Sequence, residues 1–167
     1  PGFKFRGLND PSIFFDDNHE RLVQNYRNSY IRLALYYLND GNQREKSIEA
    51  LDEMDRKIPR SILKIDHRLL FDIGNLYHSA GAKEQYEIIA REVEVDAIKA
   101  MNENPTEVSS YYNPYRILLE IYENLGEFDK AVDVLTKLQD YYPNDQSIIM
   151  QIERFKAMKT QRDTTKK

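Results

Sequence analysis

Two histidines are the first residues whose type and spacing suggest chemistry. His67 and His78 lie eleven residues apart, close to three turns of an α-helix, so both imidazoles could project from one face. Asp66 and Asp72 add two carboxylates nearby. A metal needs ligands that converge on one point, whereas eleven residues of helix separate the imidazoles by roughly 16 Å. We therefore predict no metal and no cofactor, and we interpret both histidines as ordinary polar helix residues.

Clusters of acidic residues are the second candidate for chemistry. Acid–base catalysis needs two carboxylates that face one cleft and have pKa values pushed apart. The clusters here are sequence neighbours on stretches also rich in lysine and arginine, which favours solvated helix faces with ion pairs. They are Asp16–Asp17, Asp52–Asp55 and Glu92–Asp96. The sequence also lacks a glycine-rich phosphate loop, a nucleophile elbow and a His-Glu-x-x-His motif, so we predict no catalytic residue in this chain.

Composition narrows the class of partner. The 167 residues include 28 acidic and 24 basic side chains, with both signs interspersed and a net charge of −4. This balance does not indicate binding to nucleic acid phosphates or anionic lipid. No apolar run approaches the ~20 residues of a membrane span, so we expect no membrane insertion by this chain. The absence of cysteine excludes disulfides and thiolate metal sites.

The elements that must position any site are predicted to be helices. Apolar residues recur three and four positions apart, strict alternation is almost absent, and glycine and proline fall between the periodic stretches. The sequence therefore predicts an all-α fold. The predicted helices span residues 18–39, 44–57, 64–80, 83–102, 114–125, 128–141 and 145–159.

Local residues predict how some of these helices begin and end. Residues Asp17–Glu20 have the spacing of a capping box at the start of the first helix. Gly41, Gly81 and Gly126 each follow a periodic segment, where a left-handed glycine can close a helix.

The three glycines also reveal an internal repeat. With the glycines in register, the preceding helices align without gaps and place apolar residues in the same three slots. The slots hold Tyr37, Tyr77 and Tyr122 four residues before the glycine, Leu33, Ile73 and Leu118 eight before, and Tyr30, Leu70 and Tyr115 eleven before. We expect these slots to be packed in a core. A fourth aligned position, seven residues before the glycine, holds Ala34, Gly74 and Leu119. Gly74 takes the small-residue slot there, where two helices would cross closely.

This spacing resembles the tetratricopeptide repeat, a helix–turn–helix unit. The third copy fits best, with Gly126, Ala131 and Pro143 at the expected intervals, whereas the second copy has Tyr86 where a small residue is usual. The resemblance implies a right-handed α–α superhelix of about three helix pairs and a C-terminal capping helix. We predict an extended segment at 1–17, a repeat domain at 18–159 and a polar tail at 160–167.

The resemblance also implies a binding surface for a protein or peptide on the concave side, formed by the first helix of each pair. In this register the surface carries Asn28, Ile31, Leu35, Arg68, Phe71, Asn75, His78, Asn113, Arg116, Glu120 and Asn124. Some family members grip a terminal carboxylate with basic and asparagine side chains. Here Ile31 and Leu35 replace the first polar residues of that clamp, so the match is partial. Plain solvated surface stays the alternative to a peptide site.

The N-terminal stretch carries a second resemblance. Residues 3–11 read Phe-Lys-Phe-Arg-Gly-Leu-Asn-Asp-Pro, and residues 14–18 and 25–28 continue the pattern. Over residues 3–105 the chain resembles the soluble C-terminal region of a multi-pass bacterial membrane protein family. That family is common in Bacteroidetes, and its N-terminal part is similar to protein O-mannosyltransferases. The resemblance implies an extramembrane domain of an inner-membrane protein, with the periplasmic side favoured, and carries over no catalytic residue.

The chain begins with Pro1 and its first methionine is Met54, so we expect a processed piece of a longer protein. Three other roles stay open. The repeat domain could pack against its own upstream membrane domain or self-associate. It could be an accessory domain that gates or positions substrate for a glycosyltransferase-like membrane part. It could also be a free-standing soluble adaptor.

Overall fold

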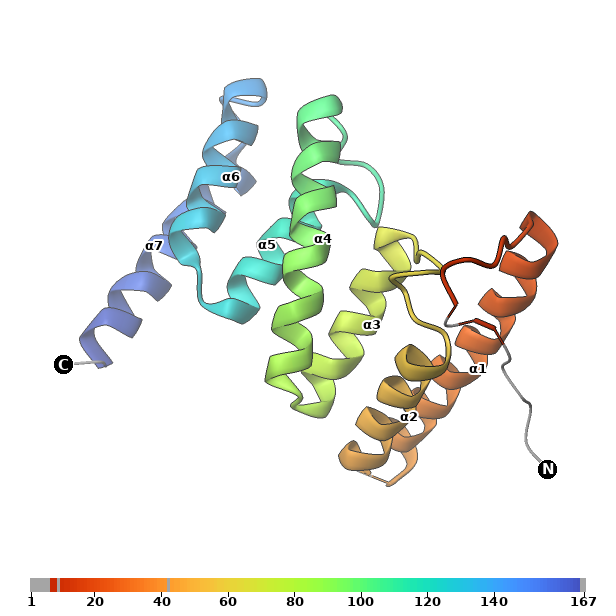
Figure 1. The fold of residues 1–167 in the computed structure, drawn as a ribbon. Coiled ribbons are helices and arrows are strands. Elements are labelled where there is room, and N and C mark those ends of the chain that lie inside the picture. The colour runs from red at the N-terminus through yellow and green to blue at the C-terminus, as the bar shows by residue number, and fades with distance from the viewer. Residues whose placement is uncertain (1–6, 9, 42, 166–167) are drawn as a thin grey trace. The chain divides into compact units, whose positions relative to one another are not determined.

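Seven α-helices form the regular structure of residues 7–8, 10–41 and 43–165, the part that the computed structural model describes (Figure 1). They are α1 (Asp17–Gly41), α2 (Arg44–Lys57), α3 (His67–Ala80), α4 (Lys83–Glu103), α5 (Pro114–Leu125), α6 (Phe128–Tyr141) and α7 (Gln146–Thr165). These residues contain no strand, so the predicted all-α fold is confirmed. Every predicted helix is present, and all the ends but one agree within three residues.

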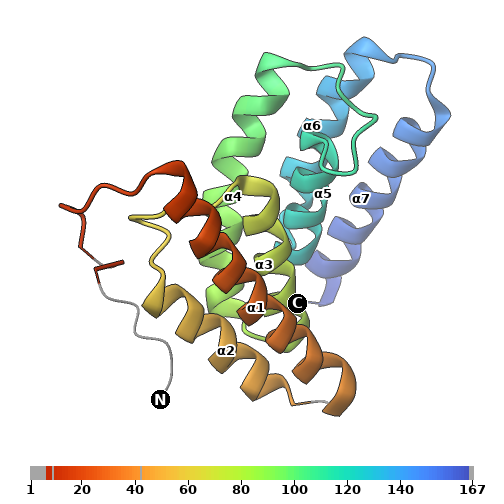
Figure 2. The ribbon, with the colours of Figure 1, turned by 90° about the vertical axis from the view of Figure 1, so that its right-hand side faces the viewer.

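The helices fall into two compact units, with the boundary between Ile89 and Ala90 inside α4. In the first unit, α1 packs along α2 to form a helix pair, and α3 contacts both (Figure 2). Leu51, Met54 and Ile73 are each at most 2% exposed and form part of the core of this unit.

Gly74 sits where α3 meets the beginning of α4. A Cβ atom added at Gly74 would lie 3.0 Å from Cγ2 of Ile89, which is tighter than about nine in ten real Cβ contacts. The small-residue slot predicted from the repeat is therefore a close helix crossing, and this approach offsets the poor helix propensity of glycine.

The second unit contains the remainder of α4 with α5, α6 and α7. α5 packs on α6, and α6 packs on α7 (Figure 1). Leu118, Leu135 and Phe155, one from each of these three helices, are at most 1% exposed. The ring of Phe155 lies 6.3 Å from the ring of Phe128, measured between centroids.

Two of the three turn glycines close their helices as predicted. Gly81 has φ 85° and Gly126 has φ 71°, both in the left-handed region. The next amide donates back to the carbonyl oxygen of the slot tyrosine, from Ala82 to Tyr77 at 2.9 Å and from Glu127 to Tyr122 at 2.7 Å. Gly41 differs, because it is the last helical residue of α1 and has no positive φ.

The predicted capping box at Asp17–Glu20 is wrong by one residue. Asp16 caps α1, because its Oδ1 accepts hydrogen bonds from the amides of Asn18 at 3.0 Å and His19 at 2.9 Å. Two consecutive aspartates offered two possible caps. The helix begins one residue earlier than the apolar periodicity indicated, which selects the first of them.

The polar tail predicted at 160–167 is helical through Thr165, where the described residues end. No glycine or proline follows Pro143, so nothing in the sequence forces α7 to stop. Arg162 supplies the contact that a polar tail was not expected to make. Its guanidinium carbon lies 5.3 Å from the ring centroid of Phe128, and its Nη1 donates a short hydrogen bond to the Gly126 carbonyl oxygen.

The N-terminal segment predicted as extended contains tight turns in its described part. The amide of Asp10 donates to the Gly7 carbonyl oxygen at 3.1 Å, and the amide of Ile13 donates to that of Asp10 at 3.2 Å. Leu8 and Phe15 pack against a small cluster formed by Val23, Ile58 and Leu63. The segment is therefore attached to the first unit by apolar contacts. The first six residues lie outside the described part.

The repeat slots are not equally packed. The slot residues of α3 and α5 are at most 4% exposed, as predicted. In α1, however, Leu33 is 41% exposed, and Tyr30 and Tyr37 are half-buried. The expectation that all three copies are packed in a core is therefore wrong for the first copy.

Candidate functional site

The interaction residues predicted in the first unit lie on α1 and α3. Six of them are at least partly accessible, and they are Asn28, Ile31, Leu35, Arg68, Asn75 and His78. Phe71 is the exception, because its side chain is only 4% exposed. A side chain this buried belongs to the packing and offers almost no surface to a partner. The binding role of the other six stays a prediction.

Three of the four residues predicted in the second unit line one hollow of about 370 Å³. They are Asn113, Arg116 and Glu120. Leu119, Leu135 and Leu138 contribute apolar lining to the same hollow. Asn124, the fourth predicted residue, is half-buried one turn further along α5. The structure thus brings cationic, anionic and apolar groups of this unit together around one concavity.

Asn113 shapes the rim of this hollow by capping α5. Its Oδ1 accepts a hydrogen bond from the Arg116 amide at 2.9 Å, and its Nδ2 donates to the carbonyl oxygens of Ser110 at 2.7 Å and Val108 at 3.3 Å. The residue is 9% exposed. Because its amide group is used in the cap and the loop, we assign Asn113 a positioning role.

Arg116 is a cation at this hollow whose orientation is fixed by its contacts. Its guanidinium carbon lies 3.7 Å from the ring centroid of Tyr111, and its Nη1 donates to the Tyr111 carbonyl oxygen at 3.2 Å. Stacking and hydrogen bonding hold the planar group in one orientation, the arrangement in which arginine recognises carboxylates well. The sequence identified Arg116, but it gave no reason to pair it with Tyr111. The pairing depends on the loop that leads into α5.

A separate network of five side chains lies where α4, α5 and α6 meet in the second unit. Arg91 donates to the two carboxylate oxygens of Glu127 at 2.8 and 2.6 Å, and to Glu94 at 3.0 Å. Lys130 Nζ lies 3.0 Å from each of these acids. The Tyr122 hydroxyl donates to Glu94 Oε1 at 2.8 Å.

The electrostatics of this network indicate structure rather than acid–base chemistry. Hydrogen bonds from Arg91, aided by Lys130, lower the pKa of Glu127 to about 2 against the opposing effect of burial. Burial alone would raise the pKa of Glu94, but hydrogen bonds from Arg91, Lys130 and Tyr122 outweigh it and lower that pKa. Both carboxylates are therefore ionised near neutral pH, whereas a proton-transfer group needs a pKa close to the working pH.

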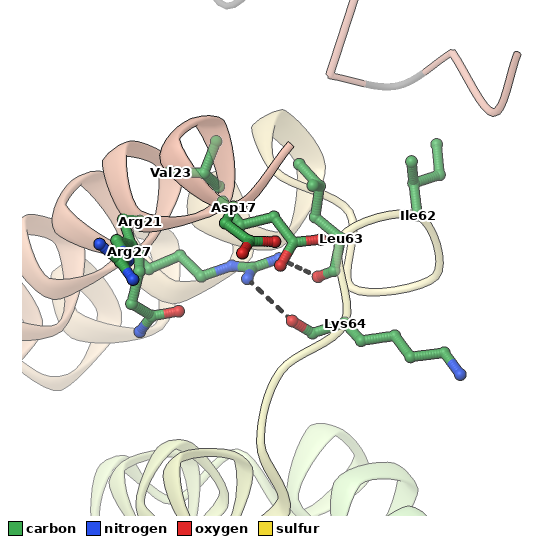
Figure 3. Close-up of a pocket in the computed structure, with 9 residues that line it drawn as sticks. Asp17, Arg21, Val23, Arg27, Ile62, Leu63 and Lys64 are labelled. Atoms are coloured by element: carbon green, nitrogen blue, oxygen red, sulfur yellow. Dashed lines mark hydrogen bonds between the residues drawn. The ribbon is translucent and has the colours of Figure 1, made fainter. Parts of the chain in front are cut away.

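Arg27 is a residue that the sequence analysis missed (Figure 3). It is 2% exposed, and its side chain extends from α1 to the connector between α2 and α3. Its Nη2 donates to the carbonyl oxygen of Ile58 at 3.3 Å and, by a short bond, to that of Leu63. Its Nη1 lies 3.4 Å from the carbonyl oxygen of Lys64.

The environment of Arg27 explains its role. Burial lowers the pKa of Arg27 to about 10, and the negative charge of Asp55 partly opposes that shift. The residue lines a hollow of about 680 Å³ together with Asp17 and Glu20. Because its terminal nitrogens donate to backbone carbonyls, we assign it to holding the connector on α1. One signal was available in the sequence, since Arg27 lies on the helix face that also carries Val23.

Neither a metal site nor a membrane span is present in the part of the chain that the structure describes. No three histidine, aspartate or glutamate side chains come close enough there to hold an ion. None of the helices in that part is both long enough and apolar enough to cross a bilayer.

Comparison with known protein families finds a match in the second unit. Residues 120–145 match the family model described as Tetratricopeptide repeat, which covers the end of α5, all of α6 and the turn before α7. The match falls on the third copy, the one whose spacing fits best. No curated protein and no solved structure matches the chain.

These comparisons give no support to the resemblance of residues 3–105 to a membrane protein family, which stays a hypothesis. Tetratricopeptide repeats are generally non-catalytic and bind proteins or peptides. The matched segment is similar to one tetratricopeptide repeat, and the all-helical fold is consistent with a tetratricopeptide-like helical repeat.

Proposed function

We propose that this chain is a non-catalytic module that binds a protein partner through a peptide segment, and that the hollow of the second unit receives this segment. The observation that carries the proposal is the guanidinium of Arg116, held over Tyr111 at the rim of an apolar lining. A fixed cation beside leucine side chains is complementary to a segment that pairs a carboxylate with an apolar side chain.

The expected binding mode follows from the lining. The carboxylate, from an acidic residue or a chain terminus, meets Arg116, and the apolar side chain packs on Leu119, Leu135 and Leu138. Glu120 and Glu123 also line the hollow. Their charge disfavours peptides with several acidic residues in a row, so the mode selects a single carboxylate.

The test is selection from a displayed random-peptide library with the intact chain, followed by calorimetry on the selected peptides. We expect one carboxylate and one apolar residue to be enriched together. Replacing the arginine in Arg116→Glu should weaken the selected peptides about tenfold or more, because it removes a charge-assisted hydrogen bond and adds a repulsion.

Lys99→Glu is the matched control, because Lys99 is a well-exposed cation on α4 of the same unit whose charge is reversed in the same way. This variant should bind the selected peptides like the wild type. Equal affinity of the selected peptides for wild type and Arg116→Glu would contradict the proposed site.

We further propose that the module is the extramembrane domain of a multi-pass bacterial inner-membrane protein, on the periplasmic side. The support is the resemblance carried by residues 3–28. Packing on, or gating, a glycosyltransferase-like membrane part is the alternative role within the same protein. Hydropathy of the sequence encoded upstream is the test. Several apolar stretches of about 20 residues are expected there, and their absence would contradict the membrane context.

A further inference from the structure

Among the described residues, nothing covers one edge of the first helix pair in the way that the other two pairs are covered. We call the surface formed by Tyr30, Leu33, Tyr37 and Lys46 the open edge. In the other two copies, the equivalent slot residues are at most 4% exposed. Leu33 is 41% exposed, although its equivalents Ile73 and Leu118 are 2% and 0% exposed.

The cover in the second and third copies is the second helix of the preceding pair. In each case that helix presents a carboxylate to the slot tyrosine. The Tyr77 hydroxyl donates to Asp52 of α2 at 2.8 Å, and the Tyr122 hydroxyl donates to Glu94 of α4 at 2.8 Å. The buried tyrosine and its acid are therefore a feature that the repeat uses twice.

The third copy shows the complete arrangement. Lys130 lies with its Nζ 5.3 Å from the centroid of the Tyr122 ring and 3.0 Å from Glu94. Met101 lies seven residues after Glu94 and lines a crevice with Tyr115. Tyr115 is the slot residue two helical turns before Tyr122. The covering helix thus contacts the pair through one acid and, two turns later, one apolar residue.

The first copy has the tyrosine and the lysine of this arrangement. Lys46 lies with its Nζ 5.6 Å from the centroid of the Tyr37 ring, as Lys130 does with Tyr122. Within the described residues, no carboxylate lies within 4.0 Å of Lys46. Tyr30, Leu33 and Tyr37 line a hollow of about 650 Å³ with Lys46 and its neighbours on α2.

We propose that the open edge binds an acidic amphipathic helix of a partner protein, in the way that α4 covers α5 and α6. A carboxylate of that helix meets Tyr37 and Lys46, and an apolar side chain seven residues further on meets Tyr30. The equivalence of Lys46 to Lys130 favours this occupant, because Lys130 meets the carboxylate of the covering helix beside Tyr122. The hollow as a whole is not cationic, since Glu49, Asp52 and Glu53 line it with Lys46 and Arg56, and Arg56 is paired with Glu53 at 2.7 Å. The partner's carboxylate is therefore expected at Lys46, for which no acidic partner lies among the described side chains.

A second copy of this chain fits the open edge poorly. If the open edges of two copies paired, Lys46 of the second copy would lie where the proposal requires a carboxylate. The other helices offer no substitute. Among the described residues, no exposed acidic residue is followed seven positions later, on the same helix, by an apolar residue. Among the described helices, a second copy therefore has no element that fits the open edge, and we assign the edge to a helix of a partner protein.

The test uses the intact chain and a labelled 21-residue peptide with the sequence of α4, which contains Glu94 and Met101 at the required spacing. Binding is measured by fluorescence anisotropy. We expect the affinity to fall about tenfold when Lys46→Glu is made in the chain, and also when the peptide carries lysine in place of Glu94. Combining the two changes should restore binding, because the ion pair is then re-formed with its charges exchanged.

Arg44→Glu is the matched control, since it reverses an exposed cation at the start of the same helix. It should leave the affinity unchanged. No binding of the peptide, or equal binding to all the variants, would overturn the proposal.

Two further results would also overturn the proposal by assigning the edge to another occupant. One is a dimer in light scattering that Lys46→Glu abolishes. The other is loss of peptide binding when the chain is extended by its upstream sequence.

Discussion

Single residues in this fold are explained by where their hydrogen bonds go. Arg27 shows this most clearly. Its side chain is only 2% exposed, and this burial is tolerated because backbone carbonyls of the connector accept hydrogen bonds from its guanidinium. The sequence placed Arg27 on an apolar face but could not show which groups it would meet, because those carbonyls lie more than thirty residues away.

Removing the guanidinium of Arg27 should destabilise the protein. We expect Arg27→Met, which keeps most of the aliphatic stem, to lower the free energy of unfolding by about 1–3 kcal/mol, because carbonyls on the connector lose their donors. Urea denaturation followed by circular dichroism measures this change.

Arg21→Met provides the comparison, because Arg21 is exposed and lines the same hollow. Its effect should stay within about 0.5 kcal/mol. Equal losses in the two variants would show that the buried hydrogen bonds of Arg27 contribute nothing special.

Between elements, a hydrogen bond from a slot tyrosine to a carboxylate of the preceding helix recurs in the second and third copies. The network of Arg91, Glu94, Tyr122, Glu127 and Lys130 connects α4 to α5 and α6. Helix positions followed from periodicity and breakers, so the sequence predicted nearly all the helix ends. It could not predict that α7 extends to Thr165, because the contact of Arg162 with Phe128 depends on tertiary packing.

The network should make stability depend on acid pH. The pKa of Glu127 is about 2 in the folded protein, against an ordinary value of 4.5. A lowered carboxylate pKa stabilises the folded state above about pH 4.5, and this contribution is lost as the pH falls from 4.5 through 2. Glu127→Gln should therefore cost about 1–2 kcal/mol at pH 6 and roughly half as much at pH 3, where Glu127 is still mostly ionised in the folded protein.

Urea midpoints of the two proteins at both pH values measure this difference. Glu153→Gln serves as the control, because Glu153 is an exposed partner of Lys156 on α7 and should change stability little at either pH. An undiminished effect of Glu127→Gln at pH 3 would be incompatible with the ion pairs seen here.

At the scale of the whole chain, the account depends on three helix pairs that share the same slots. The slots follow from aligning the three helices on their turn glycines, and the matched segment at residues 120–145 supports the third copy. The alignment could not show that the first copy is less covered than the others. A slot is defined by residue type, whereas its burial depends on a preceding pair that the first copy does not have among the described residues.

The candidate binding residues show the same limit. Arg116 and Glu120 could be predicted from the register, and the structure groups them at one hollow. Phe71 has the right register but is only 4% exposed. Register assigns a residue to a face of its helix, and only tertiary packing decides whether that face is accessible.

The central claim, that equivalent tyrosines differ in cover from copy to copy, is tested most directly by nitrating the intact native chain with tetranitromethane and mapping the products by mass spectrometry. Tyr36 and Tyr111, at 55% and 61% exposure, should react first, and Tyr77, Tyr115 and Tyr122, at 3–4%, should react last. Tyr30 and Tyr37 should react between the two groups, well ahead of their buried equivalents. Reaction of Tyr77 and Tyr122 as fast as Tyr37 would contradict the account.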